Sequence, residues 1–225
     1  MNHIQRTITY LGITTLFAGT PIVVNAQAPQ TRINQRNFQE YYNQGVQKLE
    51  QGNFSGAIAD FNQVVALNPQ FYEGFCLRGL AKSQTGNWKS AIFDFNKALQ
   101  LNPHHADAYK SRGIVHAELG NLQKAMSDFN QTIKIDPKSI DGYYNRGLAY
   151  LKQRNPQAAI KDFNQTLSLN PNLADAYGNR GLAQYALGDS KSALADLQQA
   201  ARLFRQQGNT QGYQQTQALI QQVEQ

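Results

Sequence analysis

Residues 72–105 read YEGFCLRGLAKSQTGNWKSAIFDFNKALQLNPHH, and the same order of residue types returns along the chain every 34 residues. An aromatic residue stands four positions before a glycine, an alanine follows twelve positions after it, and an aromatic residue or leucine comes four positions later. The five copies of this glycine are Gly45, Gly79, Gly113, Gly147 and Gly181. Five copies of one residue pattern at the same spacing are not expected by chance, and self-similarity at a fixed period of this size indicates a repeat architecture.

Each unit is predicted to form two helices joined by a short turn. In the first helix, the aromatic residue, the glycine and the residue three positions beyond it share one helical stripe. Gly86-Asn87 illustrates the turn, because glycine can take the left-handed conformation that ends a helix and asparagine can cap the next one. Asn102-Pro103 ends the second helix, because proline lacks an amide donor. In the fourth unit Arg154 replaces the turn glycine and Pro156 follows the cap, so we expect a normal helix after a slightly strained turn.

These positions resemble the pattern of the tetratricopeptide repeat family. The resemblance implies an all-α fold, a right-handed superhelical solenoid of five helix-turn-helix repeats. The predicted repeats span residues 38–71, 72–105, 106–139, 140–173 and 174–207.

Two further segments flank the predicted repeats. Residues 27–37 are a polar lead-in, with Asn37 as the expected cap of the first helix. Residues 208–225 are predicted to form a C-terminal capping helix, from about Thr210 to Val223. Its stripe of Tyr213, Thr216, Ile220 and Val223 would cover the exposed side of the last repeat, which an open solenoid requires.

Residues 1–26 are expected to be a signal peptide. A weakly basic start leads into an uncharged stretch that ends at Val24, and small residues precede Gln27. We predict cleavage after Ala26, no membrane span in the mature protein, and a periplasmic or secreted location. The alternative is an uncleaved anchor, because the apolar stretch nearly reaches spanning length.

The composition argues against several function classes. The chain has 21 basic and 15 acidic residues, a net charge of +6, but the basic residues are spread out, so no nucleic-acid binding is expected. Cys76 is the only cysteine, which excludes an intrachain disulfide. His104, His105 and His116 have poor spacing for metal ligands, and no phosphate loop or nucleophile motif occurs. We therefore expect no cofactor, no enzymatic activity, and a protein or peptide as partner; the oligomeric state stays open.

The family resemblance places a partner-binding groove on the first helices, one step round from the core stripe. Its predicted lining is Tyr42, Cys76, Leu80, Lys110, Ile114, Tyr144, Leu148, Leu151 and Tyr185. The aliphatic members could instead only pack adjacent first helices together. The resulting hypothesis is a non-catalytic scaffold that binds a peptide or partner protein on its concave face. The alternative is an assembly factor that acts through self-association or outer-face contacts in an envelope or membrane complex.

An arginine precedes the repeat glycine from the second unit onward, and an aspartate precedes the second-helix aromatic position. Because the first unit has Gln44 and no unit before it, each arginine is predicted to pair with the aspartate of the preceding repeat. The predicted pairs are Asp60 with Arg78, Asp94 with Arg112, Asp128 with Arg146, and Asp162 with Arg180. The alternative is that the arginines reach the groove and bind an acidic ligand.

Overall fold

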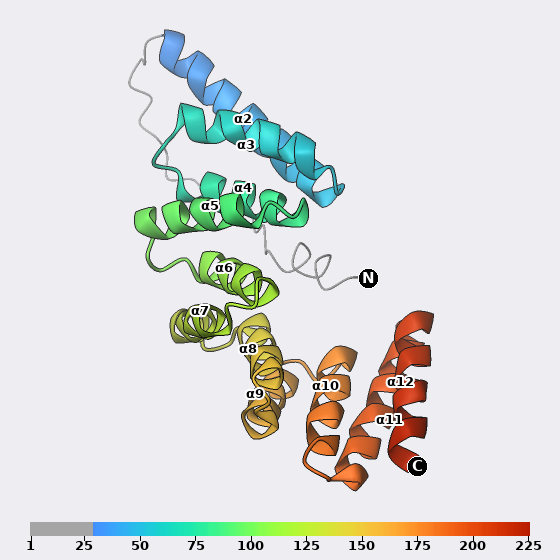
Figure 1. The fold of residues 1–225 in the computed structure, drawn as a ribbon. Coiled ribbons are helices and arrows are strands. Elements are labelled where there is room, and N and C mark those ends of the chain that lie inside the picture. Colours follow the sequence, from blue (N-terminus) through green and yellow to red (C-terminus); the bar gives the residue numbers. More distant parts are fainter. Residues whose placement is uncertain (1–28) are drawn as a thin grey trace. The chain divides into compact units, whose positions relative to one another are not determined.

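The computed structural model of the protein describes residues 29–225, with side chains from Gln35 onward. This part of the chain forms eleven helices and no strand (Figure 1). The first helices of the repeats are α2 (Pro29–Glu50), α4 (Tyr72–Gln84), α6 (Ala106–Glu118), α8 (Ile140–Lys152) and α10 (Ala174–Tyr185). The second helices are α3 (Phe54–Leu67), α5 (Trp88–Leu101), α7 (Leu122–Ile135), α9 (Pro156–Leu169) and α11 (Ser190–Gln206), and α12 (Thr210–Glu224) follows. None of these helices is both long and apolar enough to span a bilayer.

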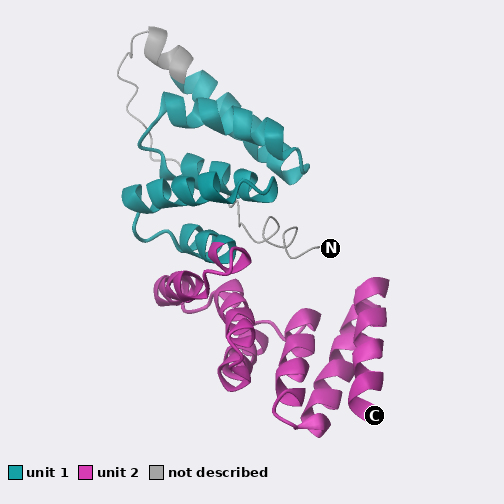
Figure 2. Ribbon diagram, viewed as in Figure 1, with its two compact units in different colours: residues 1–115 teal, residues 116–225 magenta. Residues whose placement is uncertain are grey.

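The chain divides into two compact units, residues 1–115 and residues 116–225, and the division falls within α6 (Figure 2). In the first unit α2 packs against α3 and α4 against α5. In the second unit α8 packs against α9, α10 against α11, and α12 against α11. Four of the five predicted helix pairs are therefore observed within the two units, in the predicted all-α class.

The start of the first repeat differs from the prediction. The helix α2 begins at Pro29, so most of the predicted lead-in 27–37 is helical and Asn37 lies inside the helix instead of capping it. Proline suits the first turn of a helix, and no helix breaker separates Pro29 from Glu50, so the backbone continues without interruption. The predicted signal peptide, residues 1–26, lies outside the described residues.

The turns inside the repeats have the expected conformations. Gly86 has a φ of 76°, and Arg154, which replaces the turn glycine of the fourth repeat, has a φ of 58° in the same left-handed region. The cap Asn155 accepts a hydrogen bond from the amide of Ala158 at 3.1 Å, and α9 starts normally at Pro156. The predicted strained turn before a normal helix is confirmed.

In the first, second and fourth repeats, the repeat glycine lies in close contact with an aromatic ring of the second helix. A Cβ atom added to Gly147 would lie 2.8 Å from Cε1 of Phe163, a ring that is completely buried. Gly79 approaches Phe95 in the same way, at 2.9 Å. Only glycine allows helices to come this near, which explains why the repeat keeps this residue.

The C-terminal helix has the predicted extent and buried face. Its side chains Thr216, Ile220 and Val223 are buried, and Asn209 caps it by accepting a hydrogen bond from the amide of Gly212 at 2.9 Å. The apolar part of this face packs on the core cluster of α11 that contains Leu197. The prediction of a capping helix is confirmed.

Candidate functional site

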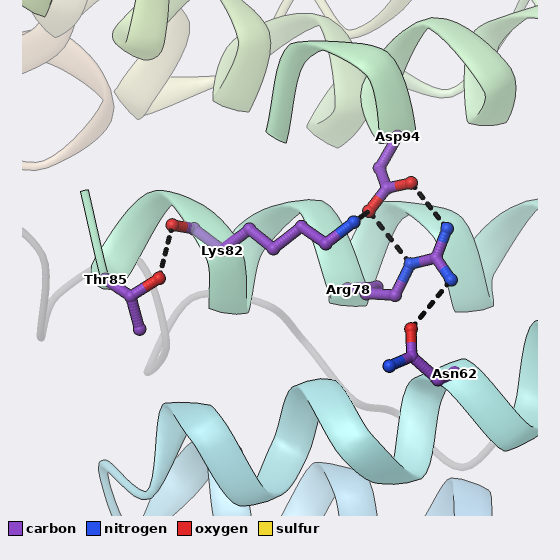
Figure 3. A network of polar contacts seen from close by, with 5 residues as sticks. All are labelled: Asn62, Arg78, Lys82, Thr85 and Asp94. Carbon is purple, nitrogen blue, oxygen red and sulfur yellow. Dashed lines mark hydrogen bonds and ion pairs between the residues drawn. The ribbon is translucent and has the colours of Figure 1, made fainter. Parts of the chain in front are cut away.

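In the second, fourth and fifth repeats, the arginine before the repeat glycine forms a paired hydrogen bond with an aspartate of its own repeat. In the second repeat, Arg78 donates from Nε and Nη2 to the two carboxylate oxygens of Asp94, at 2.9 and 2.6 Å (Figure 3). The fourth and fifth repeats repeat this geometry, with distances of 2.6 to 2.7 Å, in Arg146–Asp162 and Arg180–Asp196. Such two-bond pairs are strong and directional.

The same arginines also bond to the preceding repeat. The Nη1 atom of Arg78 donates to Asn62 on α3, at 2.9 Å (Figure 3). The corresponding bonds are Arg112 to Asn96, Arg146 to Asn130, and Arg180 to Asn164. Each guanidinium further lies over the aromatic ring three positions before it, at 5.4 to 5.6 Å from the ring centre. Each arginine thus links the helix pair of its own repeat to the second helix of the preceding repeat.

The predicted register of the arginine–aspartate pairs was therefore wrong. Asp94 binds Arg78 instead of Arg112, and Asp162 binds Arg146 instead of Arg180. The reason lies in the packing of the glycine, since Gly79 lies against Phe95 and this contact brings the preceding residues of both helices together. The partner from the preceding repeat is an asparagine, a residue that the sequence analysis did not consider.

The first repeat satisfies its aspartate in a different way. It has Gln44 in place of the arginine, and Gln44 donates to Glu40 at 3.2 Å. Asp60 instead forms an ion pair with Lys48 at 2.6 Å, one turn further along α2. In the second repeat Lys82 occupies the equivalent position and pairs with Asp94 at 2.8 Å, in addition to Arg78.

The network accounts for these arginines without a ligand. The hydrogen bonds to Asp162 and Asp196 raise the pKa of Arg146 and Arg180 above its ordinary value, because they favour the charged guanidinium. All the nitrogen atoms of Arg146 that carry protons bond to Asp162 or Asn130. Three of the five N–H groups of Arg146 are therefore used within the protein, and these bonds join its own helix pair to the preceding repeat.

Two of the predicted groove residues of the first unit, Tyr42 and Lys110, belong to a polar cluster with Glu73 and Asp107. The hydroxyl of Tyr42 donates to Glu73 at 2.9 Å, and burial together with the charge of Glu73 raises the pKa of this tyrosine. Lys110 is buried and donates to Asp107 at 2.7 Å. Leu80 is also buried, whereas Ile114 keeps a partly exposed side chain.

Cys76 is buried, and the charged side chains of this cluster act on its thiol. Burial is the main cause that raises the pKa of its thiol, and the nearby charge of Asp107 acts in the same direction. His105 packs edge-on against Tyr72, with ring centres 5.1 Å apart. Burial lowers the pKa of His105, against the opposing effect of Asp107. A thiol of raised pKa is a poor nucleophile, so Cys76 has a packing role.

In the second unit the predicted groove residues differ in their exposure. Tyr144 is buried, packs on Phe163, and accepts a hydrogen bond from Nδ2 of Asn179 at 3.0 Å. Leu148 and Leu151 are partly exposed on α8 and pack on the same core cluster. Tyr185 on α10 is 38% exposed. The accessible surface is therefore made by these apolar side chains, and Tyr144 supports it from beneath.

Sequence reasoning missed Glu73, Asp107 and Asn179 as members of these clusters. The signal that could have found Glu73 is its position near the start of the following first helix, because such residues meet the inner face of the repeat before. Among the described residues, no group of three histidine, cysteine or acidic side chains is arranged to hold a metal ion.

The comparisons with known proteins agree with this geometry. Models of the tetratricopeptide repeat match residues 72–105, 140–173 and 174–207, and a further TPR repeat model matches residues 115–153. The chain belongs to the tetratricopeptide repeat family. No curated protein is similar enough in sequence to be detected as a relative.

Several solved structures share the fold. A crystal structure of the MamA protein is 24% identical, with a TM-score of 0.66 over 78% of this chain and 96% of the other. MamA from residue 41 to its end, of Desulfovibrio magneticus RS-1, is 22% identical, with a TM-score of 0.69 over 76% and 97%. YrrB, a TPR protein described as having an unusual peptide-binding site, is 17% identical, with a TM-score of 0.64 over 85% and 98%. At these identities the likeness shows a shared architecture.

Proposed function

We propose that this protein is a non-catalytic scaffold that binds a peptide or partner protein through the first helices of its repeats. Repeat arrays of this kind present extended surfaces for recognition. The observation that carries the proposal is the partly exposed apolar surface in the second unit, formed by Leu148 and Leu151 on α8 and by Leu182 and Tyr185 on α10.

Polar groups beside this surface would orient the partner. Asn179 uses its amide nitrogen to bond to the hydroxyl of Tyr144 and to the backbone carbonyl of Asp175. In the described part of the chain no donor to its Oδ1 atom is found, so this oxygen is free to accept from a peptide amide. Apolar side chains with a few fixed polar groups are the usual composition of a binding site.

The test compares two sets of variants in pull-down experiments with quantitative mass spectrometry. Leu151→Ser combined with Tyr185→Ser removes accessible apolar area, whereas the buried Tyr144 and Lys110 would disturb the fold if changed. We expect the double variant to lose partners that the wild type retains. Leu67→Ser is the matched control, because Leu67 on the second helix α3 is 38% exposed, as Tyr185 is. Retention of every partner by a correctly folded double variant would contradict the proposal.

The exposure of Phe93 supports a second candidate function, assembly through the second helices. Phe93 is 66% exposed on α5, and an aromatic side chain of this size supplies a large contact area when another protein or another copy covers it. Loss of partners, or a decrease in mass in sedimentation experiments, on Phe93→Ser alone would favour this candidate. A monomeric wild type at high concentration would argue against self-association.

We also propose that the protein is exported, with cleavage after Ala26. The support is the composition of residues 1–26, in which an apolar stretch leads to small residues. Mass spectrometry of the protein from the envelope or medium should find a chain that begins at Gln27. An intact Met1 on the exported protein would show that the segment is retained as an anchor.

A further inference from the structure

A groove lies between α11 and α12 at the C-terminal end of the second unit. Its volume is ≈ 500 Å³, and its floor includes Ala201 and Ile220, which are both buried. The two helices lie side by side in Figure 1, and the residues that line the groove recur at helical spacing on each of them. The groove is therefore continuous along the helix pair.

The sequence of α12 prevents a helix of a further repeat from packing in this groove. Tyr213 occupies the aromatic position of a first helix, and Gln217 stands four residues later, where the repeats have glycine. That glycine is what admits the ring of a second helix, as Gly147 admits Phe163. With Gln217 at this position, a ring cannot approach in the same way. The groove is thus a surface for something other than a repeat helix.

The charged groups at the groove are unpaired and of one sign. Arg202 and Arg205 line it, and both side chains are exposed. Within residues 35–225 neither arginine side chain forms a hydrogen bond or ion pair, in contrast to Arg180, whose three guanidinium nitrogens all bond to Asp196 or Asn164. No acidic side chain lines the groove. Two guanidinium groups therefore face an accessible space without a counter-charge.

We propose that this groove binds an acidic peptide segment of another protein. Arg202 and Arg205 would bind its carboxylates, because the planar guanidinium matches a carboxylate with two parallel hydrogen bonds. Gln198 and Gln217, which also line the groove, can each donate to and accept from a peptide backbone. The buried Ala201 and Ile220 would receive the apolar part of the segment.

Charge complementarity points away from a second copy of this chain as the occupant. The chain carries a net charge of +6, and no two of its 15 acidic residues are adjacent in the sequence. A second copy therefore offers no acidic segment that could neutralise both arginines at once.

The test measures fluorescence anisotropy of a labelled peptide, built from repeats of glutamate-glutamate-leucine, with the full-length protein in low salt. The matched peptide has glutamine in place of every glutamate. We expect saturable binding of the acidic peptide only, and Arg202→Gln combined with Arg205→Gln should weaken it by about tenfold, because hydrogen bonds to charged groups are strong.

Two further variants make the result specific. Lys161→Gln with Lys191→Gln removes the same charge from exposed positions of the second unit outside the groove, and should leave binding nearly unchanged. Leu151→Ser with Tyr185→Ser should also leave it unchanged, since the proposed inner surface is a different site. Equal weakening by the two charge-removing variants, equal binding of the glutamine peptide, or no saturable binding would overturn the proposal.

Discussion

Replacing Arg146 with alanine should destabilise the protein more than the same change at Arg78, although both side chains form the same hydrogen bonds within their repeats. The difference arises from the neighbouring position on the first helix. In the second repeat Lys82 also binds the aspartate, at 2.8 Å, whereas the fourth repeat has Tyr150 at that place. Asp162 therefore has no second cation in the described structure, and Asp94 has one.

The magnitudes follow from the burial of the two carboxylates. The Asp162 side chain is 7% exposed, so without Arg146 it becomes a nearly buried charge with no partner, at a cost of about 3 kcal/mol in the free energy of unfolding. Asp94 is completely buried but keeps Lys82, so Arg78→Ala should cost only about 1–2 kcal/mol, for the lost hydrogen bonds. The double variant Arg78→Ala, Lys82→Ala should cost about 4 kcal/mol, more than the two single changes together.

Urea denaturation followed by circular dichroism in the helical region measures these differences, and thermal unfolding gives a second reading. We expect Arg146→Ala to lower the melting temperature by about 6–12 °C, since 1 kcal/mol corresponds to about 2–4 °C for a chain of this length. Equal losses for Arg146→Ala and Arg78→Ala, or additive effects of the two changes in the second repeat, would refute the reasoning.

Three further predictions concern single residues and can be checked with the same unfolding measurements. Gly147→Ala should destabilise the protein by about 1–3 kcal/mol, because the new Cβ would lie 2.8 Å from the buried Phe163. Gly178→Ala should stabilise it by about 0.5–1 kcal/mol, because that Cβ would meet nothing nearer than 4.0 Å. A loss of stability in Gly178→Ala would contradict this account. Arg154→Gly should raise stability by about 0.5–1 kcal/mol, since glycine adopts a φ of 58° without strain, and no gain would mean that the turn costs nothing. The pKa of His105 is lowered in the folded state, so the unfolded state binds a proton more readily and the free energy of unfolding decreases as the pH falls below about 6.5. The wild type should therefore lose more stability than His105→Gln between about pH 7 and pH 5. Equal losses in the two proteins would exclude this histidine as the cause.

The fold could be predicted from the sequence because each repeat presents the same local signals several times. Glycine before an asparagine cap, proline after the second helix, and an aromatic stripe are local features, and their recurrence predicts the helix pairs. The beginning of α2 was predicted wrongly, because the polar residues after Pro29 carry no apolar stripe, yet they continue a helix without a breaker.

The site was harder to predict because it depends on contacts between helices. The sequence showed that Arg146 and Asp162 recur with the repeat, but not which aspartate an arginine meets. That choice is made by the packing of Gly147 on Phe163, which brings the two preceding side chains together. The burial of Lys110 beside Asp107 could not be predicted from the sequence either, because a lysine in a first helix does not show whether its amine reaches solvent.

The bonds of each arginine have a consequence for how such a chain can change its length over evolution. Arg180 needs an aspartate sixteen residues ahead and an asparagine sixteen residues behind. Removal of residues 140–173 by recombination would bring Asn130 to the place of Asn164, so both requirements would still be met. Duplication of a unit would preserve them as well. Gain or loss of whole modules is thus tolerated, whereas a deletion of any other size would break the register at the join.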